Sequence, residues 1–218
     1  MSTEASRARL RPTGGTRSRL AVVLARHDAA PGAPPGIDAA QFAAACLADT
    51  YEVIAGLTDV TSGIAGPAGV RELLWPGDRW WPADVTVSEL AAEASHDADE
   101  LVIVAADAPD LPALVLAKIF KALQHADVVV APERSGAGCV AIGLTLPAAT
   151  WLISVPLDLD DNPISRLQAA APHRSRCATA PSWHRLRTPA SIERLDPRLE
   201  GWEETRALLS GAPLTSRD

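Results

Sequence analysis

Two carboxylates follow the most apolar run of the chain and are the residues best placed to do chemistry. Residues 101–105 read Leu-Val-Ile-Val-Ala, and Asp107 and Asp110 come next, on either side of Pro109. Five apolar residues without alternation are typical of a strand buried on both faces of a parallel sheet. Open α/β sheets bind their ligands beyond the carboxyl ends of their strands, so we expect Asp107 to face a cleft. A carboxylate there suits a hard divalent cation that carries phosphate oxygens.

Further carboxylates must come from elsewhere in the chain if Asp107 is to hold such a cation. The acidic cluster at 157–161 offers Asp158, Asp160 and Asp161, although each of them also fits a solvated turn. Asp110 is either a second ligand or the cap of a helix that begins near Pro112, and we expect the capping role.

Two loops contain residues suited to binding phosphate or sugar. Loop 26–36 follows the first apolar run, is dense in Pro and Gly, and contains Arg26 and Gly32. Backbone amides between a strand and a helix favour anions, although this loop has no P-loop pattern and also fits a plain surface crossover. In loop 132–138, Gly136 and Gly138 would let the backbone approach a ligand closely, or form a hairpin-like turn. Arg134 in that loop could pair with a phosphate through two hydrogen bonds, or lie exposed.

The elements that position these residues alternate between strands and helices. This order predicts an α/β fold with three layers, α/β/α, around a mainly parallel central sheet. His184, between Trp183 and Arg185 in one predicted strand, could be a ligand or a base, but a lone histidine near apolar residues is expected to be structural. The predicted strands span 19–25, 61–65, 72–75, 101–105, 127–131, 139–144, 176–178 and 183–186. The predicted helices span 38–57, a short turn from 67, 86–96, 112–123, 163–170, 189–195 and 201–209.

Composition excludes several classes of protein. The chain has 218 residues, 47% of them apolar, and a net charge of −7, which disfavours a general nucleic-acid binder. No apolar run reaches the length of a membrane span, and the polar start lacks the core of a secretory signal. Three widely spaced cysteines fit a reducing cytoplasm.

We expect a disordered tail at 1–18, one domain at 19–211 and a loose tail at 212–218. Trp80 and Trp81 are the first choice for a homo-oligomer contact.

Three motifs carry a resemblance to a known family. They are 106–112 (Ala-Asp-Ala-Pro-Asp-Leu-Pro), 127–132 (Asp-Val-Val-Val-Ala-Pro) and 136–138 (Gly-Ala-Gly). Together they resemble the nucleotide-diphospho-sugar transferase superfamily, the glycosyltransferase-A type fold that is shared with small guanylyltransferases. The first motif is most similar to a bacterial branch of proteins classed as glycosyltransferases, which carry Ser-Asp-Ser-Pro-Asp-Leu-Pro there. Residues 131–141 are also similar to the 2-phospho-lactate guanylyltransferases.

The resemblance implies a metal-dependent transferase that uses an activated nucleotide, in first place a nucleotide-sugar glycosyltransferase. The alternatives are a guanylyltransferase-like nucleotidyltransferase, a non-catalytic descendant that binds a nucleotide or a protein partner, and an unrelated α/β binding domain. It implies Mg²⁺ or Mn²⁺ on Asp107, the catalytic residue, with Asp158 and Asp160 as the candidate further ligands. The implied nucleotide-binding residues are Arg26, Gly32, Ala106 and Asp107, and the substrate-binding residues are Asp110, Arg134, Gly136 and Gly138.

One departure from the family concerns charge. Family members open with a loop of the form Pro-Gly-x-x-Lys-Thr-Arg, whereas residues 31–37 read Pro-Gly-Ala-Pro-Pro-Gly-Ile. The missing cations would neutralise the phosphates of the nucleotide, and such electrostatic stabilisation usually accelerates a reaction more than any other single effect. Arg26 is the residue that could replace them. Either the substrate differs from the family's, or the transferase chemistry is lost.

Overall fold

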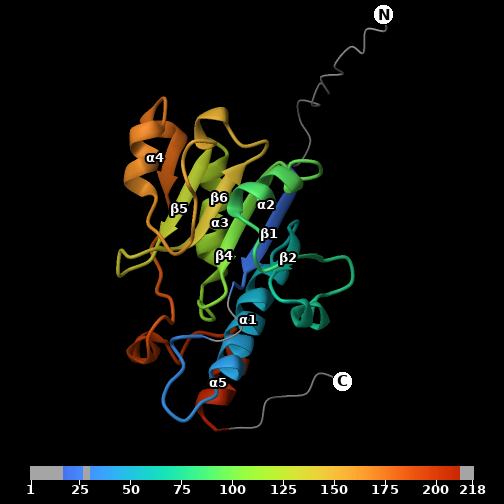
Figure 1. Ribbon diagram of the computed structural model, residues 1–218, viewed down its shortest axis with the longest axis vertical. Coiled ribbons are helices and arrows are strands. Elements are labelled where there is room, and N and C mark those ends of the chain that lie inside the picture. The colour runs from blue at the N-terminus through green and yellow to red at the C-terminus, as the bar shows by residue number, and fades with distance from the viewer. Residues whose placement is uncertain (1–16, 27–29, 212–218) are drawn as a thin grey trace, which may run out of the picture.

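One seven-stranded sheet organises the computed structural model, which describes residues 17–26 and 30–211 (Figure 1). The strands lie in the order β3-β2-β1-β4-β6-β5-β7. Their bounds are β1 Arg19–Leu24, β2 Thr61–Ala65, β3 Arg79–Trp81, β4 Glu100–Ala105, β5 Val128–Pro132, β6 Cys139–Thr145 and β7 Cys177–Thr179.

The sheet is mixed but mostly parallel. β6 runs antiparallel to both β4 and β5, while the pairs β1–β2, β2–β3, β1–β4 and β5–β7 are parallel. The chain builds outward from β1 in two directions, through β2 and β3 on one side and β4 on the other. The strand order therefore reverses between β1 and β4, and such a switch point leaves a crevice at the carboxyl ends of the two strands.

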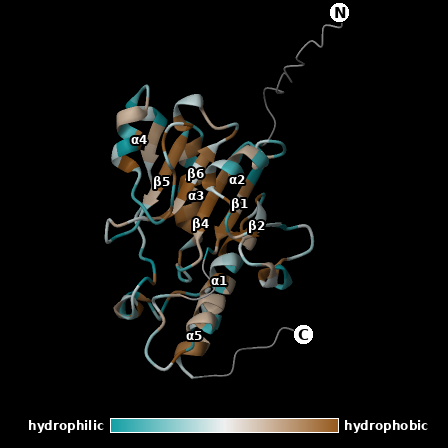
Figure 2. Ribbon diagram, in the orientation of Figure 1, coloured by the Kyte–Doolittle hydropathy of each residue, from teal (hydrophilic) through white to brown (hydrophobic). Residues whose placement is uncertain are grey.

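Helices cover both faces of the sheet, which gives the three predicted layers. Residues of α1 and α3 pack with one face of β1 and β4, and residues of α2 and α4 pack on the opposite face. Figure 2 shows the most hydrophobic residues concentrated on the central strands between these layers. The helices are α1 Ala39–Ala55, α2 Val87–Ala94, α3 Ala113–Leu123, α4 Ile164–Ala170 and α5 Glu203–Leu209, and the 3-10 helices are η1 Ala68–Leu73, η2 Thr150–Leu152, η3 Arg174–Arg176 and η4 Pro189–Arg194.

Local sequence explains where α1 and α2 begin. Asp38 caps α1 by accepting hydrogen bonds from the backbone amides of Ala40 and Gln41. Thr86 and Glu89 form a reciprocal capping box at the start of α2. These caps satisfy backbone donors that the first turn of a helix leaves without partners.

A further set of contacts joins the end of the chain to α1. Helix α5 lies beside α1 (Figure 1), and Phe42, Cys46 and Leu186 form a small buried cluster with Trp202. The buried Asp49 side chain accepts the backbone amides of Glu204 and Thr205 and so caps α5 from α1. This contact anchors the C-terminal segment to α1.

Most predicted elements are confirmed, and two strands are wrong. Of residues 72–75, the first two end the 3-10 helix η1 and the last two lie in a loop, and the edge strand β3 follows at Arg79–Trp81. Residues 183–186 form no strand beyond one isolated bridge between Trp183 and Glu133. Both errors have the same cause, because a short segment with bulky apolar residues fits a strand whether or not a neighbouring strand is available to pair with it.

The two tryptophans proposed as an oligomer contact lie mostly inside the protein. Trp81 is buried in the core, and the indole of Trp80 donates to the Gly66 carbonyl oxygen. The Arg71 guanidinium covers the Trp80 ring at 3.7 Å from its centroid. These contacts use the two rings within the chain, and the homo-oligomer stays a prediction.

The ends of the chain lie largely outside the described residues. Residues 1–16 and 212–218 of the predicted tails are outside them, as are residues 27–29 of the loop that contains Arg26. Arg17 and Ser18, which fall within the predicted tail, contact β4 and the residue before it: the Arg17 guanidinium pairs with buried Glu100, and Ser18 hydrogen-bonds Asp99. Within the described residues, every helix is too short or too polar to cross a membrane.

Candidate functional site

A cavity of about 350 Å³ lies at the carboxyl ends of β1 and β4, where the strand order reverses. Leu24 and Arg26 reach it from the end of β1, and Ala106 and Asp107 reach it from the end of β4. The Ala106 amide hydrogen-bonds the Leu24 carbonyl oxygen, so the two strand ends are tied together beside the cavity. The cavity stands where the sequence predicts a cleft, and Asp107 lines it.

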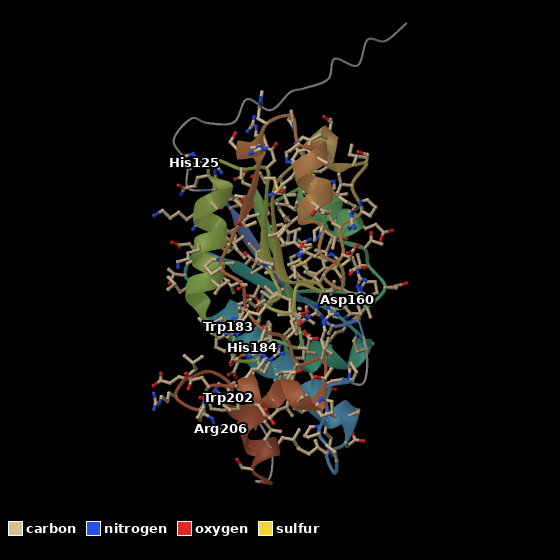
Figure 3. The ribbon with its side chains drawn as sticks, turned by 90° about the vertical axis from the view of Figure 1, so that its left-hand side faces the viewer. His125, Asp160, Trp183, His184, Trp202 and Arg206 are labelled. Carbon is tan, nitrogen blue, oxygen red and sulfur yellow. The ribbon has the colours of Figure 1, made fainter. Side chains whose placement is uncertain are left out.

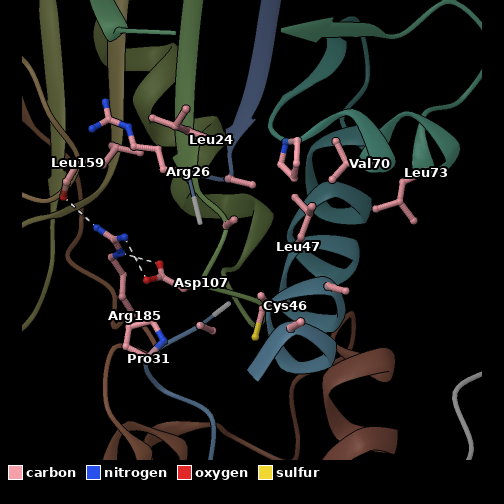
Figure 4. A pocket seen from close by; sticks show the side chains of 18 of the residues that line it. Leu24, Arg26, Pro31, Cys46, Leu47, Val70, Leu73, Asp107, Leu159 and Arg185 are labelled. Carbon is pink, nitrogen blue, oxygen red and sulfur yellow. Dashed lines mark hydrogen bonds and ion pairs between the residues drawn. The ribbon is translucent and has the colours of Figure 1, made fainter. Parts of the chain in front are cut away.

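The cavity has one apolar wall and one charged wall. Side chains of α1 and η1, among them Leu47, Val70 and Leu73, form the apolar side (Figure 4). The opposite side carries Asp107 and Arg185, with Arg26 above them in Figure 4. Such a division suits a ligand that has an apolar ring at one end and an anionic group at the other.

Asp107 is held by Arg185, an arginine that no sequence motif marks as its partner. Arg185 Nε donates to Asp107 Oδ1 at 2.5 Å, and Arg185 Nη2 donates to Oδ2 at 3.0 Å. This is the two-point pairing that the planar guanidinium makes with a carboxylate. The Leu186 amide also donates to the Asp107 carbonyl oxygen at 2.7 Å. Both side-chain oxygens of Asp107 are therefore engaged.

The rest of the Arg185 guanidinium is bound by oxygen atoms as well. Nη1 donates to the Leu159 carbonyl oxygen at 2.9 Å, to Asp160 Oδ1 at 2.9 Å and to the Cys139 carbonyl oxygen at 3.3 Å. Burial disfavours the charge of Arg185, but the carboxylates of Asp107 and Asp160 outweigh it and raise the pKa of this side chain above its usual value. Arg185 is thus a permanent positive charge.

Two more arginines neutralise the acidic cluster. Arg26 Nη1 donates to Asp158 Oδ2 at 2.7 Å, and Arg187 Nη2 donates to Asp160 Oδ1 at 2.6 Å. Burial raises the pKa of the Asp158 carboxyl, but the Asp160 amide and the Arg26 guanidinium outweigh it and leave that pKa below its usual value. Asp161, the third acid of the cluster, pairs with Arg166 at the surface.

The carboxylates predicted to hold Mg²⁺ or Mn²⁺ do not fit a resident cation in this arrangement. Asp107, Asp158 and Asp160 each pair with an arginine, so the negative charge that would attract a divalent cation is already balanced. In the described part of the chain, the group of three acids whose oxygen atoms lie within 4.8 Å of one another is a different one, Asp49, Glu52 and Glu203. Asp49 of that group already has a structural role, because it caps α5.

Asp110 does not cap α3, and that prediction is wrong. Helix α3 begins after Pro112 without a side-chain cap. The Asp110 carboxylate is buried, where Oδ1 accepts a hydrogen bond from Trp183 Nε1 at 3.0 Å and lies 3.0 Å from His184 Nε2. Trp183 and His184 lie together (Figure 3), with their rings stacked at 5.1 Å. Asp110 and His184 therefore hold the segment that carries Arg185 against the end of β4.

Two of the predicted glycines serve packing between parts of this chain. A Cβ at Gly32 would lie 2.0 Å from the Leu186 carbonyl oxygen. A Cβ at Gly138 would lie 2.6 Å from the Leu159 carbonyl oxygen and 2.9 Å from Arg187 Nη2. The close neighbours of both glycines thus belong to the segments around Arg185. Because glycine has no side chain, these segments can approach its backbone closely.

The other predicted substrate residues lie away from the lining of the cavity. Gly136 has φ +80° in the turn after β5, a conformation that favours glycine. The Arg134 guanidinium lies over the Trp183 ring, 5.0 Å from its centroid. Neither residue lines the cavity, so their roles toward a substrate stay predictions.

The cysteines near the site are poor nucleophiles. Cys46 lines the cavity and Cys139 lies behind Arg185. Burial raises the pKa of the Cys46 thiol far above its usual value and that of Cys139 to about 12. Thiols are reactive as thiolates, so neither residue is suited to covalent catalysis.

Arg185 and Arg187 are the residues that sequence reasoning missed. They flank Leu186 at alternate positions, which places both guanidinium groups on one side of an extended segment and the buried leucine on the other. That alternation is visible in the sequence, but the acids that the arginines meet lie 78 and 27 residues away.

Comparison with known proteins supports the fold. Residues 84–157, about a third of the chain, match the family described as uncharacterized proteins conserved in bacteria (DUF2064), and this region contains Asp107. No curated protein matches the chain.

Solved structures of several transferases share the architecture. A protein of Desulfovibrio desulfuricans G20, provisionally assigned as a nucleotide-diphospho-sugar transferase, superposes with a TM-score of 0.62 at 16% identity, covering 90% of this chain and 98% of its own. A cytidylyltransferase of Leptospira borgpetersenii gives 0.53 at 11% identity, with 90% and 95% covered. The glucosyl-3-phosphoglycerate synthase of Mycobacterium tuberculosis, solved with Mg²⁺ and UDP, gives 0.51 at 13% identity, with 90% and 80% covered.

Proposed function

We propose that this chain, which has the nucleotide-diphospho-sugar transferase fold, is a transferase that binds an activated nucleotide in the cavity at the ends of β1 and β4. The observation that carries the proposal is the placement of the cavity. It lies at the switch point of the sheet, and Arg26, Ala106 and Asp107, three of the four residues predicted to bind nucleotide, line it.

The two walls of the cavity divide the ligand between them. The apolar wall of α1 and η1 receives the base and ribose, and the charged wall receives the phosphates. Arg26 is the more exposed of the two arginines on that wall, with 27% of its side chain accessible against 9% for Arg185. Arg26 therefore contacts the phosphates directly, and Arg185 contributes a fixed positive charge close to them.

Sugar transfer is favoured over nucleotidyl transfer by the family resemblance of residues 106–112. In sugar transfer, the bond from the anomeric carbon to the phosphate oxygen breaks, the acceptor oxygen bonds to that carbon as its proton passes to solvent, and a nucleoside diphosphate leaves. Positive charge beside that leaving group stabilises the charge that develops on it. In nucleotidyl transfer the released product is pyrophosphate, so the product identifies the reaction.

The first experiment is a thermal-shift panel of nucleotides and nucleotide sugars, with and without Mn²⁺. A ligand present at a hundredfold excess over its Kd raises the melting temperature of a chain of this size by about 5–10 °C. Ala44→Trp fills the cavity from its lining on α1 and is expected to abolish the shift. Gln41→Trp is the matched control, because Gln41 is exposed on the same helix but does not line the cavity. No shift with any nucleotide would remove the proposal.

Turnover is tested separately from binding. Incubation of a nucleotide sugar that gives a shift with candidate acceptors should release a nucleoside diphosphate. Binding without turnover across a broad panel of acceptors would instead favour the alternative function, a non-catalytic nucleotide binder, which the missing Lys-Thr-Arg loop suggests.

A further inference from the structure

The guanidinium of Arg185 sits in a set of oxygen atoms of the kind that a hard cation takes. Its partners are both carboxylate oxygens of Asp107, one of Asp160, and the carbonyl oxygens of Leu159 and Cys139. Carboxylate and carbonyl oxygens are the ligands that Mg²⁺ and Ca²⁺ bind in proteins. In this chain the positively charged Arg185 guanidinium lies among these oxygen atoms and donates hydrogen bonds to them.

We propose that Arg185 takes the position beside Asp107 that a divalent cation would take, so that this chain binds the diphosphate of a nucleotide sugar without a metal ion. The identity of the ligand rests on the proposed function, whereas the replacement of the cation rests on the contacts of Arg185 alone. Arg26 and Arg185 then supply the positive charge of the phosphate-binding wall.

Contacts of the neighbouring residues hold the backbone of Arg185 beside Asp107, and the hydrogen bonds of the guanidinium hold its side chain among the oxygen atoms. The residue before it, His184, lies against buried Asp110, and the residue after it, Leu186, donates its amide to the Asp107 carbonyl oxygen. The Leu186 side chain is fully buried, and Gly32 leaves no space behind the Leu186 carbonyl group. Arg185 is therefore fixed on both sides by the same strand end that carries Asp107.

The ion pairs of the charged wall also disfavour a bound divalent cation. Asp158 pairs with Arg26, and Asp160 is shared by Arg185 and Arg187. The three guanidinium groups offset the carboxylates with which they pair, so a divalent cation placed beside Asp107 would find no excess of negative charge to attract it. Within this network Arg26 lines the cavity with 27% of its side chain exposed, so its guanidinium is the group that an anion can reach.

The decisive experiment is a titration with MnCl₂ alone, followed by electron paramagnetic resonance. The wild-type chain and Asp107→Asn should give the same binding curve, because Asp107 is not a metal ligand. Arg185→Met keeps an unbranched side chain but frees the carboxylates of Asp107 and Asp160. It should gain Mn²⁺ affinity by about tenfold or more, and the added substitution Asp107→Asn should remove that gain. A Mn²⁺ affinity that is about tenfold weaker in Asp107→Asn than in the wild-type chain would overturn the proposal.

The comparison of wild type with Asp107→Asn decides the question even if Arg185→Met fails to fold. A second measurement follows nucleotide-sugar binding in EDTA and in Mn²⁺, and the two Kd values should agree within about twofold. Arg26→Gln should weaken binding in EDTA by about tenfold or more, while Arg166→Gln, at an arginine paired outside the cavity, should leave it unchanged.

The outcomes separate this inference from the proposed function. Binding that requires Mn²⁺ would overturn the inference and leave the nucleotide function standing. Absence of binding in both buffers would remove the nucleotide function, and the MnCl₂ titration would still confirm or refute Arg185 as the replacement for the cation.

Discussion

The pair formed by Asp107 and Arg185 should contribute measurably to the stability of the fold. Removal of one partner of a fully buried ion pair costs about 3–5 kcal/mol. Here 20% of the Asp107 side chain is exposed, and Arg185 keeps Asp160 and two carbonyl oxygens when Asp107 is lost. We therefore expect Asp107→Ala and Arg185→Met each to lower the free energy of unfolding by about 2–3 kcal/mol.

A double-mutant cycle isolates the interaction between the two side chains. The double variant should be less destabilised than the sum of the single variants, by a coupling of about 1.5–2.5 kcal/mol, measured by urea denaturation at pH 7. The matched control is Asp161 with Arg166, whose side chains are 56% and 44% exposed and whose coupling should stay below about 1 kcal/mol. A coupling for Asp107 and Arg185 no larger than that of the control pair would refute the reasoning that Arg185 is held in place.

Two further predictions concern the packing around the site. Burial raises the pKa of the Asp49 carboxyl to about 6, well above its value of about 3.9 in an unfolded chain. The folded state therefore binds the proton more tightly, and the free energy of unfolding should fall as the pH rises from 4 to 6, by at most about 1.4 kcal/mol per pH unit. Urea denaturation across this range should show a flatter dependence on pH for Asp49→Asn than for the wild-type chain. Equal slopes for the two would contradict the raised pKa of Asp49. Gly32→Ala should cost about 2–3 kcal/mol in unfolding experiments, because its Cβ would meet the Leu186 carbonyl oxygen. Gly69→Ala, where a Cβ meets nothing within 4 Å, should stay within about 0.5 kcal/mol, and an equal effect at both glycines would rule out packing as the cause.

Local patterns account for the parts of the fold that were predictable. The start of α1 at Asp38 and the burial of β4 on both faces follow from a capping residue and an uninterrupted apolar run. The position of Asp107 follows from the same reasoning, because a residue after a central parallel strand must emerge at one edge of the sheet. These features depend on a few neighbouring residues and on the general geometry of α/β sheets.

Features that depend on distant partners were not predictable. Asp110 has the residue type and spacing of a helix cap, but the fold brings Trp183 and His184 to it and buries its carboxylate. Residues 183–186 have the composition of a strand, but the neighbouring sheet offers them one bridge, to Glu133. In both cases a local preference is overridden by a contact that forms on folding.

The sequence by itself determined that this chain is an α/β protein with a carboxylate, Asp107, at the exit of a central strand. The tertiary structure alone decided what that carboxylate meets. Arg185 lies 78 residues further along the chain, and its approach depends on Asp110, Leu186 and Gly32, which hold its segment against β4. The strength of an ion pair depends on distance in space and on burial, and neither quantity is set by separation along the chain.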